Sequence, residues 1–474
     1  MTNTSRVFIN KHLLIVVSIA YLSCTPPNSL FYLEGDLGLI NKINKIIESS
    51  GVDLNMGIKI VSLENNKTLY AYNSQKLLMP ASTNKLYTCA ATLHYLGNNY
   101  RFTTKVLKRK NNLILKGGGD PDLTIDQLDS LAIIVSKYIK KVDTLYVDDT
   151  FLDSLNYGEG WMWDEGPWWY AAPISALSVN DNCIKFYIEP GDIGNPANIN
   201  YFPETSYITF ENNSITVNDT LDFKKLKIYR DWVVNGNNFS VTGEIIDTTK
   251  KDTLYRNIYD PSLFTGTIFR QLLNEHGTIV KKLSKKTQDL TGYKELTVHY
   301  SDSLIVSAKN LMNESDNLTA ELFVKSIGAL DTLPGTWEAG LDSIKSFLAE
   351  QVKIDTSNIR LADGSGVSRY TLTNSDQLIS LLKWVYKSNH KDDFISTLPV
   401  GGWPKSTLEK RLAEEGELVR AKTGGLSGAR NLAGYIYSPK YGTVAFSILM
   451  NGYIGSSSKY NYVQDQIVKT IIYD

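Results

Sequence analysis

Histidine and cysteine are scarce in this sequence of 474 residues, which contains five histidines and three cysteines. The histidines form neither an HExxH motif nor any other paired metal-ligand spacing, and the chain has no Gly-x-Ser-x-Gly motif. These absences argue against a zinc peptidase and against a hydrolase that uses a Ser-His-Asp triad. We therefore expect no metal ion and no other cofactor.

An excess of charge of either sign is also missing, because 49 basic side chains stand against 50 acidic ones and the net charge is -1. A nucleic-acid-binding protein usually shows a basic excess, so we expect no nucleic-acid partner. A single hydrophobic core stops growing at about 250–300 residues, and the greater length of this chain predicts two or three domains.

The long apolar run of the chain lies near its N-terminus, from Leu13 to Leu22. Ten residues at about 1.5 Å each cannot cross a hydrocarbon layer about 30 Å thick, and the basic residues before the run are typical of a secretory signal. Ser23-Cys24 resembles a lipoprotein cleavage site, although Tyr21 stands where leucine is usual. We expect residues 1–24 to be a signal peptide of an exported protein with a lipid on Cys24, and simple cleavage nearby is the alternative.

Apolar periodicity divides the rest of the chain into three regions. Residues 57–72 alternate around Asn65-Asn66, which predicts a β-hairpin, and a helix should run from Pro80 to Leu96. Residues 100–300 show short alternating runs and look mainly β. Helices are expected in 304–331, 337–350, 374–388 and 458–472, and strands in 417–423, 430–437 and 442–451. The first hairpin and the last three strands could form one antiparallel sheet.

Ser82 and Lys85 are separated by three positions in the helix predicted after Pro80. This spacing places both side chains on one helix face, where the amine can take the hydroxyl proton without a histidine. The same SxxK spacing occurs at Ser380-Lys383, Ser388-Lys391 and Ser456-Lys459. The spacing alone therefore does not identify a nucleophile.

The order of three motifs does distinguish Ser82. Serine acyl-transferases of the SxxK kind also carry an SxN motif and then a KTG motif on a strand. Lys422-Thr423-Gly424 is the only KTG in the chain. Ser82 is the only SxxK serine that has an independent SxN motif between itself and this KTG. The SxN candidates are Ser154-Leu-Asn156, Ser178-Val-Asn180 and Ser315-Asp-Asn317. We choose Ser315 and Asn317, because they form a polar turn before an apolar helical stretch.

With these motifs the sequence resembles the low-molecular-mass class C penicillin-binding proteins, the D-Ala-D-Ala carboxypeptidase/endopeptidase family with a long insertion between its first and second motifs. Similar stretches include Leu115-Lys-Gly-Gly-Gly-Asp-Pro121, Ala172-Pro-Ile-Ser-Ala-Leu-Ser-Val-Asn180, Asp363-Gly-Ser-Gly-Val-Ser-Arg369 and Leu398-Pro-Val-Gly-Gly402. The resemblance implies an α+β fold, with a penicillin-binding/serine β-lactamase-like transpeptidase domain (an antiparallel sheet flanked by helices) and a large mainly-β insertion. We expect residues 30–98 and 300–474 to form the catalytic domain, and 99–299 to form an insertion of two subdomains.

The resemblance also implies roles for the motif residues. Ser82 would be the acylated nucleophile and Lys85 its proton acceptor, kept neutral by desolvation or by the like charge of Lys422. Ser315 could relay the proton to the leaving D-alanine. Asn317 would hold Lys85 and the substrate amide. The KTG motif would receive the terminal carboxylate through Lys422 and Thr423, with Gly424. The oxyanion hole would consist of the backbone N–H groups of Ser82 and Gly425.

Four further residues have two readings each. Trp161 and Asp164 could form the pocket for the diamino acid of the stem peptide, or the tryptophan-rich segment around them could pack the insertion on the catalytic domain. Ser365 and Arg369 could line the cleft or belong to an ordinary turn. Gly425 departs from the family, which commonly has threonine or serine after KTG, and this puts substrate preference and β-lactam affinity in doubt.

The expected activity is that of a periplasmic, lipid-anchored serine carboxypeptidase or endopeptidase. Its partners would be peptidoglycan peptides, and β-lactams would be its covalent inhibitors. A catalytically silent wall-binding scaffold is the alternative from another class, and a β-lactamase or esterase on the same fold is the third reading.

Overall fold

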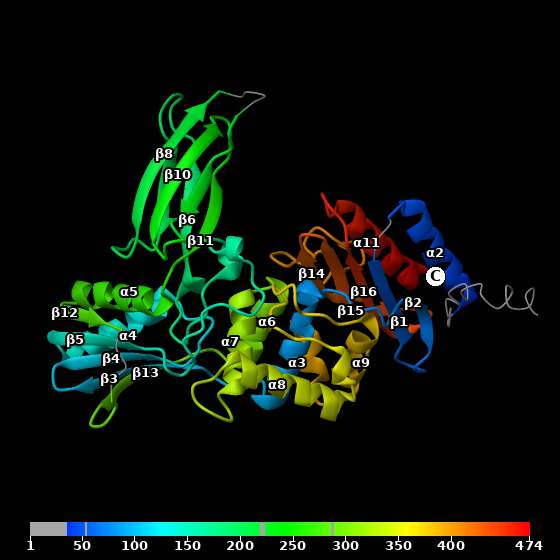
Figure 1. Ribbon diagram of the computed structural model, residues 1–474, viewed down its shortest axis with the longest axis horizontal. Coiled ribbons are helices and arrows are strands. Elements are labelled where there is room, and N and C mark those ends of the chain that lie inside the picture. The colour runs from blue at the N-terminus through cyan, green and yellow to red at the C-terminus, as the bar shows by residue number, and fades with distance from the viewer. Residues whose placement is uncertain (1–35, 53–54, 219–222, 286–288) are drawn as a thin grey trace, which may run out of the picture.

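The computed structural model describes residues 36–52, 55–218, 223–285 and 289–474. Figure 1 shows an elongated molecule in which several helices lie between two five-stranded sheets. The expected signal peptide and Cys24 lie outside the described residues. In the described ranges, no helix combines the length and the apolar character needed to cross a membrane.

One five-stranded antiparallel sheet joins the two ends of the chain. Its strand order is β14-β15-β16-β1-β2, and β1 pairs along its whole length with β16. The strands are β1 (Asn55–Ser62), β2 (Thr68–Tyr72), β14 (Val419–Leu426), β15 (Ala429–Ser438) and β16 (Gly442–Asn451). The predicted hairpin and the single sheet built from both chain ends are confirmed.

Helices cover both faces of this sheet. One face packs on α2 (Leu37–Ser50) and α11 (Ser458–Tyr473). The other faces the helices α3 (Lys85–Tyr95), α6 (Leu304–Asn313), α7 (Asn317–Gly328), α8 (Trp337–Phe347), α9 (Ser375–Lys387) and α10 (Lys391–Thr397). Because both faces are covered, β16 is buried from Thr443 to Met450 and reads in the sequence as a nearly continuous apolar run.

The helical pattern predicted over 304–331 is interrupted between α6 and α7. Ser315 has a φ of 65°, which no α-helix accommodates, and it therefore ends the first helical run. Asp316 then caps α7 by accepting the backbone N–H groups of Leu318 and Thr319. The second motif thus occupies a helix N-terminus.

The described residues between α3 and α6 form a mixed sheet and two smaller ones. The mixed sheet has the order β12-β5-β4-β3-β13, and the other two have the orders β8-β10-β9 and β11-β6-β7. Two helices in this region, α4 and α5, were not anticipated from the sequence. The elements are β3 (Thr103–Arg109), β4 (Asn112–Gly117), α4 (Ile125–Tyr138), β5 (Lys141–Asp148), β6 (Cys183–Glu189), β7 (Asn198–Phe202), β8 (Thr209–Val217), β9 (Lys227–Arg230), β10 (Asn238–Ile246), β11 (Asp252–Asn257), α5 (Pro261–Glu275), β12 (Ile279–Ser284) and β13 (Lys294–Tyr300).

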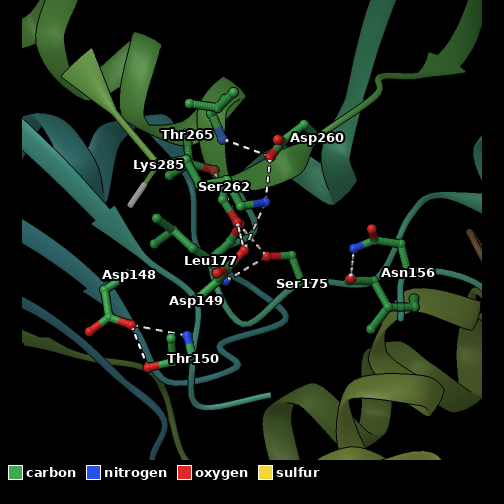
Figure 2. Close-up of polar contacts among 12 residues, drawn as sticks. Asp148, Asp149, Thr150, Asn156, Ser175, Leu177, Asp260, Ser262, Thr265 and Lys285 are labelled. Atoms are coloured by element: carbon green, nitrogen blue, oxygen red, sulfur yellow. Dashed lines mark hydrogen bonds and ion pairs between the residues drawn. The ribbon is translucent and has the colours of Figure 1, made fainter. Parts of the chain in front are cut away.

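A polar cluster joins four segments of this insertion at the start of α5 (Figure 2). The hydroxyl of Ser262 donates to Asp149, and it lies 2.8 Å from the hydroxyl of Ser175. Lys285 pairs with Asp149 at 3.0 Å and with Asp260 at 2.9 Å. These contacts tie the start of α5 to the ends of β5 and β12.

The cysteines of the described ranges, Cys89 and Cys183, are both free and buried. Burial raises the pKa of the Cys89 thiol to about 12, so this thiol stays protonated and inert at neutral pH.

Candidate active site

Ser82 lies in a short 3₁₀ turn, η1 (Ala81–Asn84), that continues directly into α3. Ser82 is half-buried, whereas Asn84 and Lys85 are buried. The side-chain amide of Asn84 donates to the carbonyl of Asp363 at 2.9 Å and so anchors the turn. The serine hydroxyl is therefore held at the start of an otherwise buried helix with part of its surface open.

The side chain of Lys85 is fully buried beside Ser82. Its Nζ lies 3.1 Å from Ser82 Oγ, and it also donates to Asn317 Oδ1 at 2.6 Å and to the carbonyl of Ser365 at 2.9 Å. Burial lowers the pKa of Lys85 to about 8, against the opposing effect of Glu321 and two aspartates. A lysine with this pKa is partly neutral near pH 8 and can accept a proton from the hydroxyl.

The first residue of α7, Asn317, is brought to the other side of Lys85. While its Oδ1 accepts from the lysine, its Nδ2 donates to the carbonyl of Tyr170 in the insertion at 2.7 Å. Ser315 is half-buried in the turn before α7, and its side chain makes no hydrogen bond to the described part of the chain. The hydroxyl of Ser315 is therefore available to a ligand.

Lys422 lies on β14, the edge strand of the sheet, next to η1. Its buried ammonium group donates to the carbonyl of Thr423 at 3.0 Å. Burial, followed by the positive charge of Lys85, holds the pKa of Lys422 well below its ordinary value. The like charge of Lys85 therefore acts on Lys422, whereas burial is the cause that lowers the pKa of Lys85 and Lys422 is not among the groups that shift it.

The close approach of β14 to η1 depends on Gly424. A Cβ at this position would lie 2.5 Å from the carbonyl oxygen of Pro80 and 3.0 Å from the backbone nitrogen of Thr83. Only glycine allows the KTG strand to run this close to the turn that carries Ser82.

The other motif candidates lie in different surroundings. Ser380 and Ser388 donate to backbone carbonyls of their own helix, and Ser456 contacts a neighbouring serine. Asn156 and Asn180 bond to backbone groups of the insertion. Among the described residues, the candidates that meet at one place are Ser82, Lys85, Asn317 and the KTG segment.

Comparison with known proteins agrees with this geometry. The family model for D-Ala-D-Ala carboxypeptidase 3 (S13) matches residues 39–471. This chain belongs to that family. The D-alanyl-D-alanine carboxypeptidase of an Actinomadura species is 32% identical over 425 residues, covering 84% of this chain and 78% of that protein. The family, the serine-peptidase class and the carboxypeptidase function predicted from the sequence are confirmed.

Solved structures of a penicillin-binding protein show the same fold. The crystal structure of penicillin-binding protein 4 from Haemophilus influenzae has a TM-score of 0.78 and 26% identity, and covers 90% of this chain and 97% of that one. The same protein complexed with a β-lactam matches with a TM-score of 0.74 and 25% identity, and covers 91% of this chain and 99% of that one. The predicted α+β, penicillin-binding fold is confirmed.

In this S13 chain two buried carboxylates, which the sequence analysis did not single out, shape the loop beside Lys85. Glu321 accepts the backbone N–H groups of Gly364 and Ser365, each at 2.8 Å, and the indole N–H of Trp337 at 2.7 Å. Asp363 accepts the backbone N–H of Ser368 at 2.7 Å. Glu321 follows Asn317 by four positions on α7, a spacing that places both on one helix face and could have signalled the connection.

These carboxylates decide the positions of Ser365 and Arg369. Ser365 is buried, and its hydroxyl donates to Asp363 at 3.2 Å, so this residue reaches the site through the carbonyl that accepts from Lys85. Gly366, at a φ of 81°, permits this close turn, since a Cβ would lie 2.0 Å from the carbonyl oxygen of Ala81. Arg369 connects the insertion to the β14–β15 turn by donating to Met162 Sδ and to the carbonyl of Ser427, each at 3.1 Å.

The tryptophan-rich segment of the insertion lies against the same loop. Trp161 donates from its indole nitrogen to Asp363 at 3.0 Å, and it lines a cavity of about 330 Å³. Glu165 and Trp232 line the same cavity, whereas the exposed Asp164 does not. Trp161 therefore takes part both in packing the insertion and in forming a cavity wall.

Proposed function

We propose that this protein is a serine-type D-Ala-D-Ala carboxypeptidase/endopeptidase that cleaves peptidoglycan stem peptides through an acyl-enzyme on Ser82. The observation that carries the proposal is the position of Lys85, whose amine is buried, has a pKa of about 8 and lies 3.1 Å from the Ser82 hydroxyl. A weakly basic amine at this distance activates a serine without a histidine.

Acylation begins when Ser82 Oγ attacks the carbonyl carbon between the two D-alanines. The hydroxyl proton passes to neutral Lys85 as the new C–O bond forms. The C–N bond then breaks, and the leaving amine receives a proton from Lys85 through the hydroxyl of Ser315. Water hydrolyses the resulting ester, which releases the shortened peptide and regenerates the serine.

The backbone N–H groups of Ser82 and Gly425 would stabilise the negative charge on the attacked carbonyl oxygen. The direction of the β14 backbone supports the second donor. Ala421 donates its N–H away from β15, to the carbonyl of Pro399 at 2.9 Å. Because backbone groups alternate along a strand, the N–H of Gly425 points to the same outer side.

Asn317 would orient the substrate amide, while Lys422 and Thr423 would bind the terminal carboxylate. The cavity lined by Trp161 is our candidate for the diamino acid of the stem peptide. There Glu165, which lines the cavity, is better placed than the predicted Asp164 to meet an ammonium group. Burial raises the pKa of Glu165, and an ammonium ligand would favour its ionised form.

An enzyme that acts on the cell wall must be exported, which agrees with the secretory signal expected in residues 1–24. Periplasmic location and a lipid on Cys24 remain part of the proposal. Mass analysis of the membrane-extracted N-terminus would show the lipid, and replacement of Cys24 by alanine would release the protein into the soluble fraction.

Intact-mass analysis with a penicillin tests the nucleophile. The wild type and Ser388→Ala should each gain one penicillin mass, and Ser82→Ala should gain none. A parallel assay with a D-Ala-D-Ala peptide should show D-alanine release in the same two forms. If neither an adduct nor D-alanine release appears in the wild type, the protein is instead interpreted as a catalytically silent wall-binding scaffold.

A further inference from the structure

The space beside Gly425 is occupied by the side chain of another residue. Gly425 on β14 is the cross-strand partner of Arg430 on β15, so both side-chain positions face the same side of the sheet. A Cβ at position 425 would lie 2.6 Å from Arg430 Nη1. The guanidinium group therefore occupies the place that a side chain at position 425 would take.

Arg430 is fixed in this place through its Nε. This nitrogen donates to Asn461 Oδ1 on α11 at 2.7 Å. The neighbouring carboxylate of Asp465 is engaged by another arginine, Arg411, at 2.6 Å. In the described part of the chain, neither terminal amino group of Arg430 has a hydrogen-bond partner, so both can donate to a ligand.

The charges around Arg430 favour an anion. Arg430 and Lys85 both act electrostatically on Lys422, so the guanidinium group adds positive charge close to the KTG strand. Arg430 is half-buried, and within the described residues both terminal nitrogens of its guanidinium group are free to donate. A guanidinium group binds a carboxylate through two parallel hydrogen bonds, which a single hydroxyl cannot do.

We propose that Arg430 binds the C-terminal carboxylate of the substrate, in the place of the hydroxyl that residue 425 lacks. The proposal deepens the proposed function and rests on it, because it assigns the carboxylate end of the same stem peptide to a named side chain. Arg430 thereby makes the site selective for peptides that end in a free D-alanine carboxylate.

A structural role for Arg430 is the competing explanation, because the residue also ties β15 to α11 through Asn461. The two roles differ in their dependence on the ligand. A residue that binds the carboxylate affects only ligands that carry this group, whereas a structural residue affects carboxylate and amide ligands alike.

The experiment measures peptide binding in a Ser82→Ala background, so that no turnover is required. The probes are an N-acetylated L-Lys-D-Ala-D-Ala peptide and the same peptide with a C-terminal amide, titrated by calorimetry. The free acid should bind more tightly than the amide. Arg430→Ala should weaken binding of the acid about 10- to 100-fold and leave the amide unchanged. Lys459→Gln, which removes an exposed positive charge from α11, should change neither affinity.

Arg430→Gln keeps the test informative if Arg430→Ala unfolds, because it retains a long polar side chain without the charge, and it should weaken binding of the acid alone. A further variant tests the place of the missing hydroxyl. Gly425→Thr combined with Arg430→Ala supplies a hydroxyl in the vacated space and should recover part of the preference for the acid. An unchanged preference for the acid in Arg430→Ala, equal losses for both peptides, or no preference in the form that retains Arg430 would each overturn the proposal. The mass assay on Ser82 reports separately on the proposed function.

Discussion

Lys85 Nζ lies 2.6 Å from Asn317 Oδ1, although 232 positions separate the two residues along the chain. The contact joins the first motif, on α3, to the second, at the N-terminus of α7. It gives the buried amine a neutral hydrogen-bond acceptor, whereas an anionic one would hold the lysine protonated.

The rate of acylation should rise with pH through a midpoint near 8. The reason is that Lys85 must be neutral to accept the proton of Ser82, and burial lowers its pKa to about 8. The neutral fraction grows as the pH rises through this value and then levels off. Stopped-flow acylation by a chromogenic β-lactam measures the profile, and a rate independent of pH across this range would contradict the role of Lys85.

Asn317→Asp should move this midpoint upward by about one pH unit or more, because an adjacent negative charge favours the protonated lysine. The acylation rate at pH 7 should fall accordingly. Asn156→Asp is the matched control, since Asn156 belongs to another SxN triplet and lies in the insertion. The same shift in both variants would show that the effect is not local to Lys85.

Glu321→Gln should destabilise the fold by about 1–3 kcal/mol, because the new amide group would face backbone or indole donors that the carboxylate now accepts. Urea unfolding followed by fluorescence measures the change. Glu314→Gln, at an exposed position just before α7, should leave the free energy of unfolding nearly unchanged.

The pH dependence of unfolding gives a second readout for Glu321. Burial raises its pKa from 4.5 to about 7, so the folded state binds the proton more tightly than the unfolded state. The contribution of this group to stability is therefore present below the unfolded pKa and is lost as the pH rises toward 7. The Glu321→Gln variant should lack this loss, and an unaltered pH slope would argue against a buried, titrating Glu321.

Gly424→Ala should reduce the rate of acylation of Ser82 strongly while reducing the free energy of unfolding only moderately. The added methyl group would meet the carbonyl of Pro80 at 2.5 Å, so β14 or η1 must move apart. The movement should cost about 1–3 kcal/mol of stability and displace Ser82 from Gly425. Acylation kinetics together with thermal unfolding distinguish the two effects, and a variant that acylates at the wild-type rate would contradict the required close approach.

The three motifs could be predicted because their order along the chain is more specific than any one of them. Ser82 shares its spacing with three other serines, and the later SxN and KTG motifs separate it from them. The strands β15 and β16 were predictable for another reason. Both strands are covered on both faces of the sheet, so nearly all of their residues are buried and most of them are apolar.

The four-residue spacing from Asn317 indicates the helix face of Glu321, but neither the buried donors that Glu321 accepts nor the role of Arg430 could be predicted from the sequence. A carboxylate within an apolar helix looks the same in a sequence whether it faces solvent or accepts three buried donors. The role of Arg430 depends on the strand register that places it opposite Gly425, and this register is a property of the folded sheet. Ser365 also contributes its carbonyl to Lys85, which no side-chain pattern reveals. The domain limits at 98 and 300 stay predictions.

The pairing of β1 with β16 has a consequence for when the enzyme becomes active. The strand that precedes the nucleophile completes its sheet only with a strand near the last helix, so closing this sheet requires contacts between distant parts of the chain. A growing polypeptide that ends before Val419 lacks β14, and with it Lys422 and the N–H of Gly425. Ser82 therefore gains its complete site only after the chain has been made as far as β16, and a shorter polypeptide should not form the acyl-enzyme.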